Sequence, residues 1–117
     1  MKSVARVTLS HTATANLKQI AQKTRLTPNV IARFAMLASF EHDSIPAPDL
    51  GKPELVINQS SLFGELEPFL LTAFSAKTKG VVDSDRSKLL AAHIARGAAH
   101  LTLRVNSVID LVKLCIT

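Results

Sequence analysis

The sequence contains no tryptophan and no tyrosine, and it has only five phenylalanines. Because aromatic rings form the platforms on which unpaired bases stack, this scarcity argues against a dedicated single-strand-binding surface. A single cysteine, Cys115, excludes an intrachain disulfide and is typical of a reducing compartment. No apolar run approaches the roughly 18 residues of a membrane span, and no apolar segment follows the basic start. We therefore expect a soluble, cytoplasmic protein.

The sequence also lacks the motifs that mark common catalytic and cofactor sites. It contains no GxxxxGKS/T, GxGxxG, HExxH or CxxC pattern. Cys115 lies in an apolar tail without an adjacent base. The carboxylate pairs Glu65/Glu67 and Asp83/Asp85 flank expected helix starts, where a negative charge favours the helix dipole. We expect a non-enzyme that needs no cofactor and binds no metal.

Acidic residues are missing from one third of the chain. The formal net charge is +5, and residues 1–40 contain six lysines and arginines but no aspartate or glutamate. Residues 41–60 form an acidic, proline-rich segment, and residues 61–117 are mixed. This distribution predicts a polyanionic partner that contacts the first forty residues.

The first forty residues predict a strand followed by two helices. Apolar residues alternate over residues 4–9, which is typical of a short strand. Ser10 or Thr12 can cap a helix over about 13–23, and Thr27-Pro28 marks the start of a second helix that ends near Phe40.

The second of these helices is apolar around most of its circumference. Such a helix must be buried, and a chain of this size can rarely enclose one by itself. We therefore expect another subunit to cover it, so that the protein is a homo-oligomer.

The remainder of the chain predicts a loop and three further helices. The prolines of residues 41–60 exclude a helix there, although Leu55-Val56-Ile57 can be extended. Helices are expected from about Glu65 with Pro68 in the first turn, from a cap at Asp83 or Ser84, and over about 106–114. The prediction is one mainly α domain, 1–117, with a short N-terminal strand and about five helices. Its parts are a ribbon-helix-helix-like unit over 4–40, the loop 41–60 and C-terminal helices over 61–117.

The strand–helix–turn–helix order has two interpretations. In a ribbon-helix-helix protein the strand pairs with the same strand of a second subunit, and the ribbon enters the DNA major groove. Arg6 and Thr8 would then face the bases. An ordinary edge strand in a helical domain accounts for the same pattern.

A cluster of cations lies on the first helix and its exit. Lys18, Lys23 and Arg25 suit contacts with phosphates, and the start of the helix at Thr27 adds backbone N–H groups and a favourable dipole. A solvated helix face is the alternative. Arg6 and Arg33 complete the residues that we expect to bind DNA.

A polar stripe lies on the helix that follows Asp83. Its members are His93, Arg96, His100 and Arg104. The two histidines are about 10 Å apart along an ideal helix, so they cannot chelate one metal from that helix alone. The favoured interpretation is a partly buried hydrogen-bonding stripe. The neighbouring Gly97 permits close approach of another helix.

Three stretches of the sequence resemble one protein family. They are RVTLSHTATANLKQIAQKTRLTPNVIARFAMLAS, NQSSLFGEL and LAAHIARGAAHL, and together they resemble the DNA sulfur modification protein DndE family. The resemblance implies a ribbon-helix-helix-like fold, a tetramer, and binding of nicked double-stranded DNA through a lysine-rich surface. It also implies other DNA phosphorothioation proteins as partners and no cofactor.

The resemblance can be carried to individual residues. Lys18, Lys23 and Arg25 match the basic helix of the family, although Ala21 and Gln22 stand where the family is richer in lysine and arginine. The segment that begins with His93 matches the family's His-x-x-Arg-Gly segment, for which no chemistry is implied.

These observations lead to three hypotheses. The first is a non-catalytic DNA-binding subunit of a phosphorothioation system. The alternative is a ribbon-helix-helix repressor that reads DNA sequence through a two-stranded ribbon. The third is a structural adaptor whose basic face binds an acidic protein.

Overall fold

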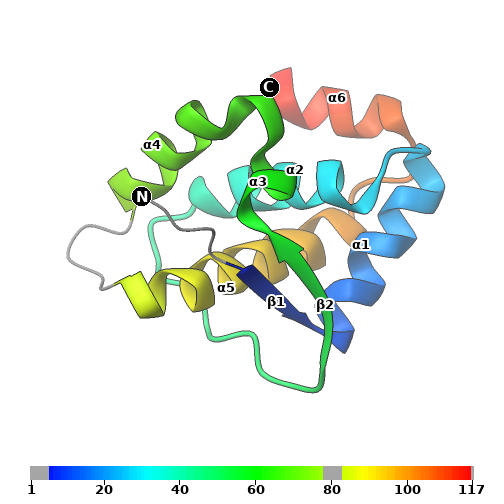
Figure 1. Cartoon of the computed structure of the whole chain (residues 1–117). Helices are drawn as coiled ribbons and strands as arrows, with labels where there is room; N and C mark the ends of the chain where they lie inside the picture. The colour runs from blue at the N-terminus through cyan, green and yellow to red at the C-terminus, as the bar shows by residue number, and fades with distance from the viewer. Residues whose placement is uncertain (1–5, 78–82, 117) are drawn as a thin grey trace.

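The computed structural model describes residues 6–77 and 83–116, and for residues 77, 83–85 and 114–116 it describes the backbone alone. Helices cover one face of a small two-stranded sheet (Figure 1), and the predominance of helix confirms the mainly α prediction. The elements are β1 (Arg6–Ser10), α1 (His11–Thr24), α2 (Pro28–Phe40), β2 (Pro53–Asn58), α3 (Gln59–Phe63), the 3-10 turn η1 (Gly64–Leu66), α4 (Glu67–Lys77), α5 (Asp83–Thr102) and α6 (Val108–Ile116).

The N-terminal strand finds its partner in its own chain. β1 and β2 run antiparallel, with Arg6 opposite Asn58 and Leu9 opposite Leu55. The premise of the ribbon-helix-helix prediction, a strand that must pair with a second subunit, is therefore wrong. The proline-rich loop, which is shorter than expected and ends before Pro53, returns the chain to the edge of β1.

Both helices after β1 have a predicted side-chain cap: Ser10, one of the two candidates, caps α1, which begins at His11 and not near residue 13, and Thr27 caps α2. The Ser10 hydroxyl accepts a hydrogen bond from the Ala13 N–H, and the Thr27 hydroxyl accepts one from Val30, with Pro28 in the first helical turn. Each side-chain cap satisfies a backbone donor that the first turn of a helix leaves unpaired.

Helix α2 is covered mainly by the chain itself. It packs chiefly on α5, with α1 and α3 beside it. The fully buried Ile31, Ala35 and Met36 lie in the core, so burial of this face needs no second subunit, contrary to our expectation. Phe34 and Leu37, on another side of α2, remain partly exposed.

The second half of the chain departs from prediction mostly in detail. Pro68 is the second residue of α4, as expected, but the short helix α3 was not anticipated. The expected cap at Asp83 or Ser84 lies outside the side chains that the structure describes. At the start of α6 the Ser107 hydroxyl accepts a hydrogen bond from the Asp110 N–H, and the Asp110 carboxylate accepts one from the Asn106 N–H.

Among the described helices, none combines the length and apolarity that a bilayer crossing requires.

Candidate nucleic-acid interface

Helix α1 presents its cations on the outside of the molecule. Lys18, Lys23 and Arg25 are all exposed, and α1 contains no acidic residue. Lys18 and Lys23 are five positions apart, which at about 100° per residue places them at the two borders of the exposed face. We call Lys18, Lys23 and Arg25 the α1 basic surface.

The two lysines have different neighbours. Lys18 Nζ lies 3.7 Å from Glu54 Oε2 of β2, and Lys23 Nζ donates to Asn106 Oδ1 in the turn between α5 and α6, at 3.4 Å. Both contacts are on the surface, where an ion pair or hydrogen bond contributes little free energy. Phosphates could replace either contact at small cost.

Arg25 caps the C-terminal end of α1. It adopts a left-handed backbone conformation with φ of 63°, and its N–H donates to the Ala21 carbonyl. This conformation costs a residue other than glycine roughly 1–2 kcal/mol. The Thr24 hydroxyl donates to the Ile20 carbonyl at 2.8 Å, which fixes the last turn. Arg25 is therefore held as an exposed residue at the corner between α1 and α2.

The start of α2 offers fewer donors to a phosphate than the sequence suggested. Pro28 has no N–H, the Val30 N–H is bonded to the Thr27 hydroxyl at 3.3 Å, and the Ile31 N–H donates to the Thr27 carbonyl. The helix dipole remains, but most of the backbone contacts that we expected here are already occupied.

Arg6 extends the cationic region across the sheet. The exposed residues of β1, Arg6 and Thr8, share the outer face with Glu54, Val56 and Asn58 of β2, because side chains alternate along a strand. Arg6 lies opposite Asn58. It is therefore about 13 Å from Glu54 along the sheet, at roughly 3.3 Å per residue.

Arg33 has a different role from the other four predicted residues. Its Nε donates to the Leu62 carbonyl and its Nη2 to the Ser61 carbonyl at 3.3 Å. These carbonyls belong to the last turn of α3, where helical partners are missing. The half-buried guanidinium holds α2 against α3, so we do not assign Arg33 to the interface.

Sequence analysis missed an acidic residue beside the basic surface. Glu54 Oε1 lies 2.5 Å from His11 Nδ1, while its other oxygen faces Lys18. The hydrogen bond from His11, with a smaller contribution from Lys18, holds the pKa of the Glu54 carboxyl below its usual value. No local sequence pattern signals this contact, because the pairing of β1 with β2 brings Glu54 beside His11.

The His-x-x-Arg-Gly segment forms a structural clamp. The Ser39 hydroxyl is 2.8 Å from His93 Nδ1 and accepts a hydrogen bond from Arg96 Nε, also at 2.8 Å. Arg96 also donates to the Ser39 carbonyl at 2.9 Å and to both oxygens of Ser44. The segment therefore joins α5 to the end of α2 and to the loop that follows, which supports the hydrogen-bonding interpretation.

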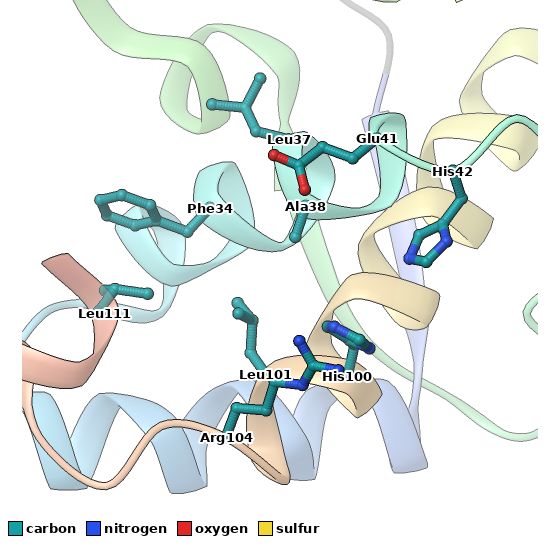
Figure 2. Close-up of a pocket in the computed structure, with 9 residues that line it drawn as sticks. All are labelled: Phe34, Leu37, Ala38, Glu41, His42, His100, Leu101, Arg104 and Leu111. Atoms are coloured by element: carbon teal, nitrogen blue, oxygen red, sulfur yellow. The ribbon is translucent and has the colours of Figure 1, made fainter. Parts of the chain in front are cut away.

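A pocket of about 520 Å³ opens beside this clamp (Figure 2). Phe34 and Leu111 lie toward one end of it, and His42, His100 and Arg104 toward the other. The rings of His42 and His100 meet edge to face, 5.7 Å apart. Partial burial, with the nearby Arg104 and His42, lowers the pKa of His100, although Glu41 acts in the opposite direction. In the part of the chain that the structure describes, metal-ligating side chains form no group of three or more.

The fold and its cationic helix define a small, mainly helical protein with a basic outer surface. Residues 6–108 match the family described as DNA sulphur modification protein DndE, and the chain belongs to this family. Solved structures that are similar to it include two of DndE. DndE from Escherichia coli B7A, described as involved in DNA phosphorothioation modification, is 27% identical, with a TM-score of 0.69, and covers 89% of this chain and 100% of its own.

The second is a DndE mutant carrying two glycine-to-lysine substitutions, described as involved in DNA phosphorothioation. It is 26% identical, with a TM-score of 0.67, and covers 82% of this chain and 94% of its own. A comparison with curated proteins found no match.

Proposed function

We propose that this chain is a non-catalytic DNA-binding subunit of a DNA phosphorothioation system, and that it binds nicked double-stranded DNA. Membership of the DndE family implies a role in DNA phosphorothioation. The observation that carries the finer proposal is the α1 basic surface: Lys18, Lys23 and Arg25 project from a helix that has no acidic residue.

This surface suits recognition of the DNA backbone. Lysines act as mobile point charges that contact phosphates without reading bases, and Arg25 can make a forked contact with one phosphate. Arg6 would add a contact across the outer face of the sheet. A nick changes the backbone and leaves the bases paired, so backbone contacts are the means of recognising it. Binding through such contacts releases counterions and weakens steeply as salt rises.

The proposal includes a homo-oligomer, with a tetramer as the expected form. Apolar side chains remain uncovered around the pocket and on α6: Leu37 is 36% exposed, Ile109 62% and Val112 52%. Apolar surface grouped in this way is typical of an interface between subunits. Several copies would place their basic surfaces along one duplex, and other phosphorothioation proteins are the further partners. A cytoplasmic location follows from this role.

The structure weakens the repressor alternative. That hypothesis needs β1 to form a ribbon with a second copy, whereas β1 pairs with β2 of the same chain. Arg6 and Thr8 are exposed, but they belong to an intrachain sheet covered by helices on its other face.

The test compares three duplexes of one length: nicked, intact, and intact with a randomised sequence from which tight binders are selected. Affinities are measured between about 50 and 200 mM salt, where phosphate contacts have their largest effect. Preference for the nicked duplex, whatever its sequence, supports the proposal. Selection of one intact sequence supports a repressor instead, and absence of binding at the lowest salt leaves the acidic-protein adaptor.

A further inference from the structure

Lys18 meets an acidic partner in the protein itself. The Glu54 carboxylate lies between two α1 side chains, with Oε2 at 3.7 Å from Lys18 Nζ and Oε1 at 2.5 Å from His11 Nδ1. Glu54 is therefore an anion next to a cation that we assign to DNA.

The position of Glu54 is fixed by the fold. Its strand is paired with β1, and the His11 N–H donates to the Lys52 carbonyl at 2.8 Å, two residues before Glu54. Nearby, the Asp49 carboxylate accepts hydrogen bonds from the backbone N–H and the hydroxyl of Ser10. These contacts tie Asp49 and Lys52, which precede Glu54, to Ser10 and His11 at the start of α1. The backbone that carries Glu54 cannot move away from α1 when DNA arrives without breaking them.

Glu54 is ionised at neutral pH, as an exposed glutamate ordinarily is, and the hydrogen bond from His11 lowers its pKa further. A phosphate bound to Lys18 would lie within several ångströms of this carboxylate. That separation is shorter than the Debye length of about 10 Å at 0.1 M salt, so the repulsion is not screened away.

We propose that Glu54 is an internal competitor for DNA and sets the affinity of the basic surface. In the free protein it holds Lys18, and binding transfers the ammonium group from the carboxylate to a phosphate. His11 keeps Glu54 in place and partly balances its charge during the transfer. Glu54 is thus a residue that lowers the affinity for DNA and keeps binding reversible. This inference rests on the proposed function of the α1 surface.

The test uses Glu54→Gln, which removes the charge and nearly preserves shape. The matched control is Asp43→Asn, the same charge change at an exposed position in the loop after α2. Affinity for a nicked duplex is measured for both in the full-length protein, after thermal unfolding has shown that each variant folds. We expect Glu54→Gln to raise affinity about three- to tenfold and Asp43→Asn to change it less than twofold.

A double-mutant cycle with Lys18→Gln tests the transfer itself. If Glu54 acts by holding Lys18, the gain in DNA affinity caused by Glu54→Gln should be smaller by at least about half in the Lys18→Gln background than in the wild type. An equal gain in both backgrounds, or no difference between Glu54→Gln and Asp43→Asn, would overturn the inference. The proposed function would survive that result as long as the wild type still prefers the nicked duplex. If neither the wild type nor Glu54→Gln binds DNA, both ideas fall, whereas binding by Glu54→Gln alone would support the competitor role of Glu54 and contradict the proposed function.

Discussion

Gly97 of α5 lies against the backbone of Ala35 in α2, and a Cβ added to the glycine would stand 1.8 Å from the Ala35 carbonyl oxygen. Two helices can approach this closely only where one lacks a side chain. The contact lies in the interface between α2 and α5, the most extensive one among the described elements, and Arg96 of the clamp directly precedes Gly97. The His-x-x-Arg-Gly segment is therefore explained by packing and hydrogen bonding.

Gly97→Ala should destabilise the fold despite the better helix propensity of alanine. The propensity gain is about 1 kcal/mol, but the methyl group would force the two helices apart, and overpacking costs typically about 1–3 kcal/mol and sometimes more. We expect a net loss of roughly 2 kcal/mol in the free energy of unfolding, measured by urea denaturation. Ala99→Ser, on the exposed side of α5, is the control and should cost under about 0.7 kcal/mol. A Gly97→Ala protein as stable as wild type would refute the packing explanation.

The Ser39–Arg96 contact should show strong energetic coupling. Ser39 is 1% exposed and its hydroxyl accepts a charged hydrogen bond, so removing one partner leaves the other unsatisfied. In a double-mutant cycle of Ser39→Ala and Arg96→Met, we expect a coupling of about 1–3 kcal/mol in unfolding free energy. Arg96→Lys should not restore stability, because lysine cannot bridge Ser39 and Ser44 together. Additive effects of the two substitutions would mean that the clamp contributes little.

Lys23→Glu should weaken DNA binding by direct charge reversal. The variant would make one phosphate contact fewer, so the slope of log affinity against log salt concentration should be smaller by about 0.9. Its affinity at about 100 mM salt should be roughly tenfold lower. The matched control is Lys88→Glu, an exposed lysine in the N-terminal part of α5, which is the end of that helix that lies away from α1 in Figure 1. Fluorescence anisotropy with a nicked duplex measures both. If the two variants lose the same affinity, net charge alone is responsible and the α1 surface has been misassigned.

Leu37→Asp should dissociate the oligomer and leave the subunit folded. Leu37 lies at the edge of the pocket and is already 36% exposed, so a charge there adds little to the cost of folding. The charge would, however, be buried without a partner in a subunit interface, which is strongly unfavourable. Light scattering should report a smaller particle, with an unchanged far-UV spectrum. Leu50→Asp, on the exposed proline-rich loop, should leave the particle size as it is. An unchanged oligomer in Leu37→Asp would contradict the assignment of this surface.

His100 should make folding stability depend on pH. Its pKa in the folded protein is lowered from 6.5, chiefly by burial and then by Arg104 and His42. The unfolded chain therefore binds the proton more readily, and stability falls as pH drops below the unfolded pKa. Urea midpoints at about pH 7.5 and pH 5.5 should differ more for wild type than for His100→Gln. Equal differences would show that His100 does not contribute.

Local features of the fold were predictable from sequence, and long-range contacts were not. The caps at Ser10 and Thr27 and the place of Pro68 follow from backbone donors and proline geometry within a few residues. The pairing of β1 with β2 joins segments more than forty residues apart, and no local pattern encodes it. Because β1 has a partner in its own chain, the expected need for pairing with a second subunit disappears.

The same contrast between local features and long-range contacts applies to the candidate site. The exposure of Lys18, Lys23 and Arg25 could be predicted because α1 has a clear apolar stripe that fixes which side faces out. The roles of Arg33 and Glu54 could not, because each depends on a partner from a distant element. Charge in the sequence therefore predicted an exposed cationic surface but could not show which cations already have partners.

The decisive measurement for the proposed DNA-binding role is the affinity of the full-length protein for nicked and intact duplexes of one sequence, measured in parallel over a salt series. If the protein binds nicked DNA through its phosphates, the nicked duplex should bind more tightly at every salt concentration, and affinity should fall steeply as salt rises. Equal affinity for the two duplexes, or binding that does not respond to salt, would rule out this role.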